Sequence, residues 1–441
     1  MILGVKLVFA LLFLWGIFRL IDKWSFFKNA PFSAMSLKFA FSLKVVAGGV
    51  LVLLYTFYYT DRQTADVFKY YDDGEVLCCV AKTHPLDFVK VMVGIEDDFL
   101  KERYLDKMSY WYRPYDHGLR NDNRIVIRIN AVLHLVSFGN YYIHALVFIF
   151  LSFLGCLFLA KLFFEVTQCK ISAFISAFLV PSVFLWSSGV LKEALLIFAL
   201  GVFCWSIYRL SKVFSWTNLV LAALAFFLLF SIKIYVFVAL LPALIFWFIW
   251  MKQACFWKAS LLFGAIFLGG FFFFHLVFPQ VDLVSLLVAK QHDFIRLSQE
   301  FKAGSTISMR YLENDFWSIL ASTPQALFHT FTLPWFWHVK SLLYLPSIIE
   351  NMLVFILCVL AIVYFKRPDK LRFQFLVFSG IFILSLFTII GLTTPVIGAL
   401  VRYKVPALPF LFFVFLSLTN FSNRNIKFTQ HKAIKWINMY L

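Results

Sequence analysis

The sequence predicts an all-α protein, a polytopic bundle of transmembrane helices. Of its 441 residues, 62% are hydrophobic and only 14% are charged, and the mean hydropathy is +0.84. Soluble domains are only about half apolar, so this composition indicates a membrane protein. In addition, the apolar residues fall in runs of about 20, the length of a helix that crosses the hydrocarbon core.

About eleven apolar runs are long enough to be spans. They cover residues 2–21, 38–59, 141–164, 171–189, 194–210, 216–232, 235–251, 259–278, 346–365, 373–392 and 405–421. The pattern predicts a single transmembrane domain over residues 1–441. The first run is expected to be a retained anchor, because its cations follow the apolar residues, whereas those of a signal peptide precede them.

Lysine and arginine residues mark alternate connections between the expected spans. They gather near residues 23–44, 170, 209–212, 252–258, 366–372 and 424–435. Since positive loops face the cytoplasm, the N-terminus and the remaining connections are predicted to lie outside. The net charge of +17 then reflects orientation and contact with anionic lipid. Nucleic acid is not an expected partner, because the cations are spread over six segments instead of one patch.

Acidic residues gather in the two large outer connections, residues 60–140 and 279–345. Thirteen of the 23 Asp and Glu residues lie between Asp61 and Arg128, and five more lie within residues 279–340. Chemistry is therefore expected where these two extracytoplasmic loops meet the bilayer surface.

The start of the first loop offers a candidate general base. If residues 60–74 form a helix, one polar face against the membrane carries Asp66, Lys69, Tyr70 and Asp73. A base for a sugar hydroxyl must be ionised and within hydrogen-bond reach, and burial or a nearby cation sets its pKa. The candidate catalytic residues are Asp66, Asp73, Asp72 and Asp61.

Two further segments of this loop are amphipathic. Residues 84–95, which begin with His84 and Pro85, alternate apolar and polar positions at near-helical spacing, as does the stretch 125–138 after the N-cap residues Asn121 to Asn123. Both are expected to be helices that lie in the membrane interface and do not cross it.

Lys192 and Glu193 end a second outer segment, Ser187-Ser188-Gly189-Val190-Leu191-Lys192-Glu193. Adjacent residues on a helix do not face each other, so each charge needs another partner next to hydrocarbon. A phosphate is one candidate for Lys192, and a simple interfacial turn with a snorkelling lysine is the alternative.

Arg402, Tyr403 and Lys404 form a third outer segment just before the last span. Cations are out of place there by the charge rule. A guanidinium offers a planar fork and an ammonium a point charge for a phosphate, so this segment is a candidate seat for an anionic lipid headgroup. Alternatively, Arg402 pairs with an acid of the first loop.

This layout resembles the GT-C superfamily of membrane glycosyltransferases. That superfamily has an acid early in the first outer loop with a tyrosine after it, then a His-Pro element, and a late Arg-Tyr. Asp66 with Tyr70, His84-Pro85 and Arg402-Tyr403 occur here in that order. The chain also resembles poorly characterised bacterial membrane proteins with "NDNR" and "SSGVLKE" stretches, here residues 121–124 and 187–193.

The resemblance implies transfer of a sugar from a polyprenyl-phosphate carrier to a glycan, lipid or protein on the outer face of a bacterial inner membrane. Asp66 would take the acceptor proton, and Arg402 with Lys192 or Lys404 would stabilise the departing phosphate. Because Val67 replaces the acid that usually follows the base, a divalent cation such as Mg²⁺ or Mn²⁺ is left open; the histidines and cysteines show no metal-ligand spacing. The candidate substrate-binding residues are Tyr70, His84, Asp122, Arg124, Lys192, Glu193, Arg402, Tyr403 and Lys404.

Two other functions remain as alternatives. An oligosaccharide polymerase or ligase would use the same lipid-linked glycans and would depend on Arg120, Arg124 or Arg310. A flippase for lipid-linked sugars would place ionisable residues inside the membrane and use broken helices. The span interiors are almost uncharged in sequence, which favours chemistry at the outer face.

Overall fold

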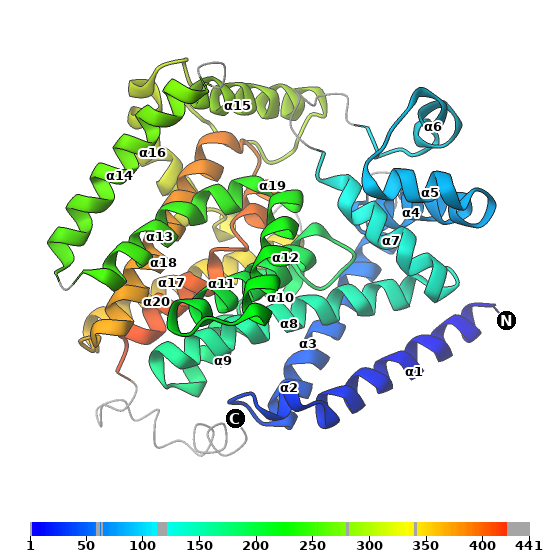
Figure 1. Cartoon of the computed structure of the whole chain (residues 1–441), viewed down its shortest axis with the longest axis horizontal. Helices are drawn as coiled ribbons and strands as arrows, with labels where there is room; N and C mark the ends of the chain where they lie inside the picture. Colours follow the sequence, from blue (N-terminus) through cyan, green and yellow to red (C-terminus); the bar gives the residue numbers. More distant parts are fainter. Residues whose placement is uncertain are drawn as a thin grey trace.

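The computed structural model describes residues 2–58, 62, 65–112, 121–253, 255–278, 282–338 and 342–420. Within these ranges the chain is almost entirely helical, and its only β pairing consists of two isolated bridges. The prediction of an all-α fold is confirmed for this part of the chain. Figure 1 shows the helices gathered into one bundle, with the N-terminal helix along one edge.

The first half of the bundle alternates long apolar helices with short polar ones. A π-helical turn, Leu54–Tyr58, extends α3. The helices are α1 (Ile2–Lys23), α2 (Ser25–Lys28), α3 (Ala34–Leu53), α4 (Asp66–Thr83), α5 (Pro85–Val93), α6 (Asp98–Arg103), α7 (Asn123–Ser137), α8 (Tyr141–Thr167), α9 (Lys170–Phe178) and α10 (Pro181–Trp186).

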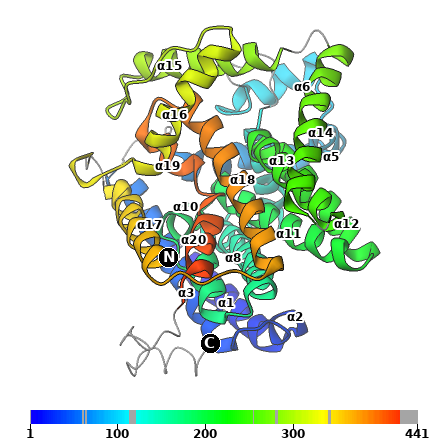
Figure 2. The ribbon, with the colours of Figure 1, turned by 90° about the vertical axis from the view of Figure 1, so that its left-hand side faces the viewer.

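The second half completes the core and adds an outer layer. Helix α15 lies across the top of both ribbon views (Figures 1 and 2). The helices are α11 (Lys192–Lys212), α12 (Trp216–Ile232), α13 (Ile234–Lys252), α14 (Phe256–Val277), α15 (Leu283–Glu300), α16 (Phe316–Thr332), α17 (Leu345–Val363), α18 (Lys370–Thr393), α19 (Ile397–Tyr403) and α20 (Leu408–Leu418).

Seven helical segments of the described chain are long and apolar enough to cross a membrane, and an eighth is added if the bent pair α19 and α20 counts as one span. The chain is therefore an integral membrane protein. The remaining expected spans correspond to α12, to the segment Phe256–Phe267 of α14 and to the pair α9 and α10. The number eleven itself stays a prediction.

Two breaks occur in the helices: one divides a span expected to be continuous, and the other bends the chain at the start of the last expected span. The run 171–189 is split into α9 and α10 at Leu179 and Val180, because Pro181 cannot donate to the preceding turn and disfavours helical backbone at the residue before it. Helices α19 and α20 meet at an angle of 64°. Helix α9 packs against α20, and α10 contacts α19, so the two breaks are neighbours.

Helices α8 and α11 pack with their backbones in contact. A Cβ atom on Gly155 would collide with the backbone of Ile197 and Phe198, and one on Gly201 would collide with the backbone of Gly155. Small residues allow such close approach in membrane bundles, where packing drives helix association. This crossing holds the start of α11 in a fixed place.

We expect Gly155→Leu to destabilise the protein by more than about 3 kcal/mol, because the new side chain has only backbone to displace. Gly264→Leu on α14 is the matched control, since a Cβ there meets nothing within 4 Å. Thermal unfolding in detergent should show a lower midpoint for the first variant alone. Equal midpoints would contradict the close α8 and α11 crossing.

Polar connections meet at two opposite ends of the bundle, as the alternation of charged loops predicts. Contacts at the first end join Lys6 to Gly139, Asp122 to Lys192, Glu193 to Arg402 and Ile307 to Pro395. Contacts at the second end join Asp22 to Lys38, Thr167 to Arg372 and Lys366 to Leu418. All the segments predicted to lie outside belong to the first end. We therefore call it the outer end, since loops rich in Lys and Arg are expected to face the cytoplasm.

Helices α4 to α7 form a subassembly at the outer end, visible at the upper right of Figure 1. The expected helices over 84–95 and 125–138 are present as α5 and α7. Leu86, Val89 and Val93 on α5 are exposed, which suits a helix in the membrane interface. The face of α4 expected to be polar is different: Tyr70 and Asp73 are buried, because α4 packs against α7.

Candidate functional site

The centre of the candidate site is the turn between α10 and α11, residues 187–193. The sequence pattern places this turn at the bundle surface, but every one of its residues is buried. Lys44 of α3 reaches it from one side and donates to the hydroxyl oxygen of Ser187 at 2.7 Å. The carbonyl of Ser188 leaves no room for a Cβ on Gly48 of α3, so α3 packs directly on the turn.

Glu193, in the first turn of α11, holds two cations from distant parts of the chain. Its carboxylate oxygens lie 3.2 Å from Nη2 of Arg402 on α19, and Oε1 lies 3.1 Å from Nζ of Lys233. The guanidinium also stacks over the ring of Trp186, 5.3 Å from its centroid. With only 1% of Glu193 exposed, this is a buried charge network in which one carboxylate serves two cations.

Lys192 points to a different partner, as expected for a residue adjacent to Glu193. Its ammonium lies 2.7 Å from Oδ1 of Asp122, just before α7, and 5.6 Å from the ring centroid of Tyr70 on α4. The first loop is thus tied to the start of α11. Five charged groups of the described chain meet here, three cations and two carboxylates, and we call them the outer charge cluster: Asp122, Lys192, Glu193, Lys233 and Arg402.

Two tyrosine rings join the outer charge cluster. The ring of Tyr403 lies 4.6 Å from the Lys233 ammonium and 5.8 Å from the ring of Tyr235. On its other side it contacts Phe294 of α15 at 6.3 Å. Aromatic faces attract cations, so these rings help to hold the ammonium beside Glu193.

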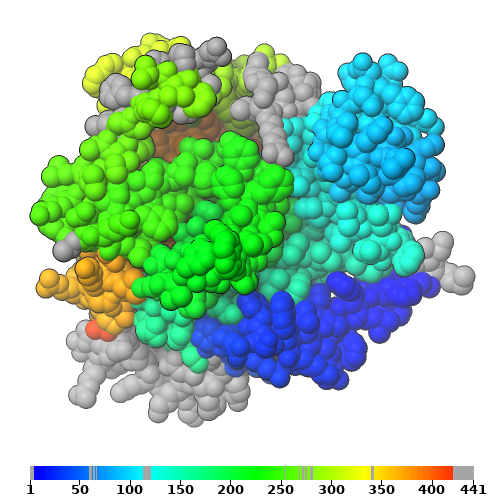
Figure 3. Space-filling view, in the orientation of Figure 1, coloured from blue at the N-terminus to red at the C-terminus, as the bar shows by residue number. Residues whose placement is uncertain are grey.

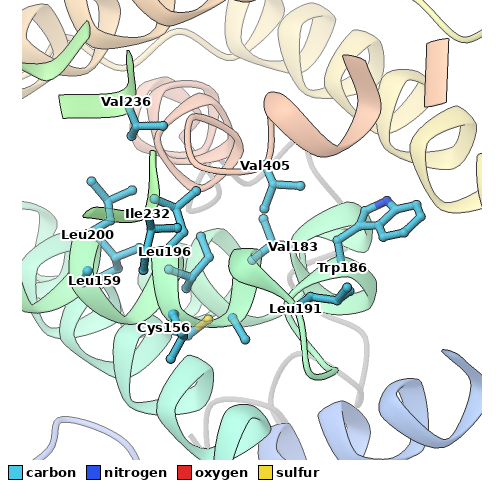
Figure 4. Packing of buried hydrophobic residues seen from close by; sticks show 14 of the residues in the cluster. Cys156, Leu159, Val183, Trp186, Leu191, Leu196, Leu200, Ile232, Val236 and Val405 are labelled. Atoms are coloured by element: carbon cyan, nitrogen blue, oxygen red, sulfur yellow. The ribbon is translucent and has the colours of Figure 1, made fainter. Parts of the chain in front are cut away.

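Buried apolar side chains that pack next to the outer charge cluster include Trp186, Leu191 and Ile232, which are labelled in Figure 4. Three of the charged residues lie against a buried apolar residue, either next to them in the chain or in space. Leu191 precedes Lys192, Ile232 precedes Lys233, and Trp186 lies under Arg402. Close packing of this kind allows little adjustment, so the charged side chains project from a rigid base.

Asp66, the first candidate base, begins α4 one helical turn before Tyr70. Since the Tyr70 ring contacts Lys192, the start of α4 lies beside the outer charge cluster. Nothing is described of the Asp66 side chain, and Asp61 lies outside the described residues altogether.

Asp73 has a structural role in the first loop. Its two oxygens accept hydrogen bonds from the backbone amides of Ser109 at 3.0 Å and Tyr110 at 2.8 Å. Burial raises the pKa of this carboxyl to about 6, although the two amides oppose the shift. Both oxygens are therefore engaged within the loop, whereas a base must reach a substrate hydroxyl.

We expect Asp73→Asn to destabilise the loop by about 2 kcal/mol, because the amide can accept from only one of the two backbone donors. In the folded protein the pKa of Asp73 is about 6, above the usual value for Asp. The stability that this raised pKa contributes to the wild-type protein is therefore fully present below about pH 4. It is lost as the pH rises through about 6. Chemical unfolding between pH 4 and 7 should show this slope in the wild-type protein, and a variant with the same slope would contradict the assignment.

Three other predicted residues make their contacts elsewhere in the first loop. The two oxygens of Asp72 lie 2.7 and 3.0 Å from the guanidinium of Arg62, in a solvent-exposed ion pair. The ring of His84 lies 3.2 Å from Nη2 of Arg103. Arg124 pairs with Glu96 at 2.7 Å. These contacts hold the loop together.

Lys404 points away from Arg402, into a second buried polar group. Its ammonium donates to the carbonyl of Leu333 at 3.1 Å and to the side-chain oxygen of Asn351 at 3.0 Å, and lies 3.9 Å from Oε1 of Glu350. Glu350 also accepts a hydrogen bond from the backbone amide of Ser182. This group, Ser182, Glu350, Asn351 and Lys404, joins α17 to both broken spans.

The structure therefore brings together Tyr70, Asp122, Lys192, Glu193, Arg402 and Tyr403, and separates Asp72, Asp73, His84, Arg124 and Lys404 from them by their own partners. Sequence reasoning missed Lys233, Tyr235 and Glu350. Lys233 carried a usable signal, since it is a lone cation in a short outer turn, where the charge rule disfavours it.

No group of three or more His, Cys, Asp or Glu side chains that could hold a metal ion occurs among the described residues. Comparison of the chain with protein-family models, curated proteins and solved structures gives no match.

Proposed function

We propose that the chain is a membrane glycosyltransferase that moves a sugar from a polyprenyl-phosphate carrier to an acceptor at the outer face of a bacterial inner membrane. One observation carries the proposal: α4, α7, α11 and α19 bring Tyr70, Asp122, Lys192, Glu193 and Arg402 into one cluster. Asp66 begins the helix that carries Tyr70.

The cluster suits the charge changes of sugar transfer. An acceptor hydroxyl attacks the anomeric carbon, the bond from that carbon to the phosphate oxygen breaks, and the electron pair leaves with the phosphate. Fixed cations in a water-poor site stabilise this developing charge, and Arg402 and Lys192 supply them. Asp66 accepts the proton of the hydroxyl. Glu193 orients Arg402 through its two-point contact.

An apolar cavity beside the cluster supports a lipid substrate. It has a volume of about 210 Å³ and lies between α15 and the chain around Pro395, with Phe294 in its wall. Phe294 also contacts Tyr403, next to Arg402. Figure 3 shows the molecule hollowed between α13 and α15 on the face in view. A hydrocarbon chain in this cavity would place its phosphate near the cations.

A second candidate, a flippase for lipid-linked sugars, is favoured by one observation. Glu350 and Lys404 are buried where the two broken spans meet, and Lys44 is buried inside α3. Transporters use buried charges beside discontinuous helices. Lys404 and Glu350 are nevertheless paired with each other, and Lys404 also donates to two protein oxygens while Glu350 accepts from the amide of Ser182. These contacts suit a structural link between α17 and α19.

Reconstitution of the purified protein with a radiolabelled polyprenyl-phosphate sugar tests both candidates. The proposed enzyme forms a labelled product and free polyprenyl phosphate when an acceptor is supplied, and parallel reactions with Mg²⁺, Mn²⁺ or EDTA establish the metal requirement. A flippase instead moves the intact donor across the vesicle membrane. Intact donor with no glycosylated product would refute the glycosyltransferase.

A further inference from the structure

Tyr235 carries a buried hydroxyl that has no hydrogen-bond partner among the described residues. It lies in the first turn of α13, two residues after Lys233. The ammonium of Lys233 is 5.9 Å from its ring centroid, and the Tyr403 ring is 5.8 Å away. Glu193, Asp122 and Arg402 all lie close enough to act on the phenol electrostatically. Tyr235 therefore lies beside the outer charge cluster.

Other phenol groups of the bundle have partners. The hydroxyl of Tyr71 donates to the carbonyl of Gly139 at 2.8 Å, that of Tyr141 to the carbonyl of Val67 at 3.3 Å, and that of Tyr344 to the hydroxyl of Ser305 at 2.8 Å. A buried donor without an acceptor costs about 1–3 kcal/mol. Phenylalanine would avoid this cost at position 235. A role in binding would explain why a tyrosine occurs there instead.

We propose that Tyr235 is a specificity-determining residue whose hydroxyl donates a hydrogen bond to a phosphate oxygen of the bound substrate. The inference rests on the proposed function, because it assigns the acceptor to the phosphate that the cations of the outer charge cluster attract, Lys233 and Arg402 among them. The donor is neutral, and both cations lie beside it. A phosphate completes the hydrogen bonding of Tyr235 and places its negative charge near both cations. The hydroxyl oxygen of an uncharged prenol could accept the hydrogen bond but brings no negative charge to the cations.

The proposal gives the hydroxyl opposite effects in the empty and the bound protein. Without ligand, Tyr235→Phe removes a buried donor that has no acceptor, so the melting temperature should stay equal to that of the wild-type protein or rise. With ligand, the variant lacks one hydrogen bond to a charged group, so its Kd should increase about tenfold or more. A merely structural tyrosine would not show this reversal.

Thermal unfolding in detergent, with and without farnesyl phosphate, inorganic phosphate or farnesol, tests the proposal. Farnesyl phosphate should stabilise the wild-type protein and should bind Tyr235→Phe more weakly, while farnesol stabilises neither. Tyr71→Phe is the matched control, because it breaks the bond to Gly139 and should lower the melting temperature without changing the Kd for farnesyl phosphate.

The outcomes separate the inference from the proposed function. Equal Kd values for farnesyl phosphate in the wild-type protein and Tyr235→Phe would overturn the role of Tyr235 and leave the function standing. Binding of inorganic phosphate alone, weakened in the variant, would support Tyr235 as a phosphate donor and refute the lipid carrier. A wild-type protein stabilised by neither phosphate compound would overturn both.

Discussion

Replacing Glu193 by alanine should destabilise the protein by about 3–5 kcal/mol, because it leaves the buried ammonium of Lys233 and the largely buried guanidinium of Arg402 without their shared carboxylate. Arg402 and Lys233 both lie against Glu193, which is almost completely buried. Thermal unfolding of the purified protein in detergent, followed by tryptophan fluorescence, should show a large fall in the midpoint. Glu300→Ala on α15 is the control, since Glu300 is exposed.

A triple variant distinguishes lost charge balance from lost packing. Glu193→Ala combined with Lys233→Met and Arg402→Met removes every charge of this network and keeps apolar bulk. Replacing a complete buried ion group by apolar residues is often neutral or stabilising, so most of the lost stability should return. The triple variant should still lack sugar transfer, because Arg402, one of the two cations proposed to stabilise the departing phosphate, is gone. A triple variant as unstable as Glu193→Ala would contradict the electrostatic explanation.

Asp66→Asn should abolish measurable sugar transfer, with a fall in rate of roughly 10²- to 10⁴-fold, the usual contribution of a general base. Asparagine has the same shape as aspartate and cannot accept the proton. Because Asp66 begins α4, where asparagine is well tolerated, the variant should fold normally. The measurement is the initial rate of transfer from a radiolabelled polyprenyl-phosphate donor at saturating acceptor.

Asp72→Asn is the matched control for Asp66→Asn. It removes a carboxylate six residues further along the same helix, where the pair with Arg62 is exposed and contributes little to stability. Its transfer rate should stay within about twofold of the wild-type rate, since Asp72 makes no chemical step in this mechanism. If Asp66→Asn turns over at the wild-type rate, or if Asp72→Asn loses turnover, Asp66 is not the general base and another carboxylate has that role.

The meeting of distant outer segments was predictable from sequence. The charge rule placed residues 60–140, 187–193 and 393–404 on one side of the membrane, and in the structure the segment 187–193 contacts the described parts of both others. The separate partners of Lys192 and Glu193 also followed from helical geometry, because adjacent positions point in different directions.

The depth and direction of individual side chains were not predictable. Arg402 and Lys404 look alike in sequence, yet one reaches Glu193 and the other Glu350, because only tertiary packing decides which element lies on each side of α19. Glu350 is a lone charged residue in an apolar run. From the sequence alone, such a residue can equally well form a buried ion pair or lie at the exposed end of a span. The Tyr235 hydroxyl is a similar case, since its missing partner is visible only once its neighbours are placed.

Product analysis by mass spectrometry tests the central claim most directly. The purified protein is incubated with a polyprenyl-phosphate sugar and an acceptor in lipid nanodiscs, beside the variant Arg402→Gln. The wild-type protein should release polyprenyl phosphate and glycosylated acceptor in equal amounts, and Arg402→Gln should slow both together. If the donor stays intact with the wild-type protein across a panel of sugars and acceptors, or if Arg402→Gln forms product at the wild-type rate, the outer charge cluster does not catalyse sugar transfer.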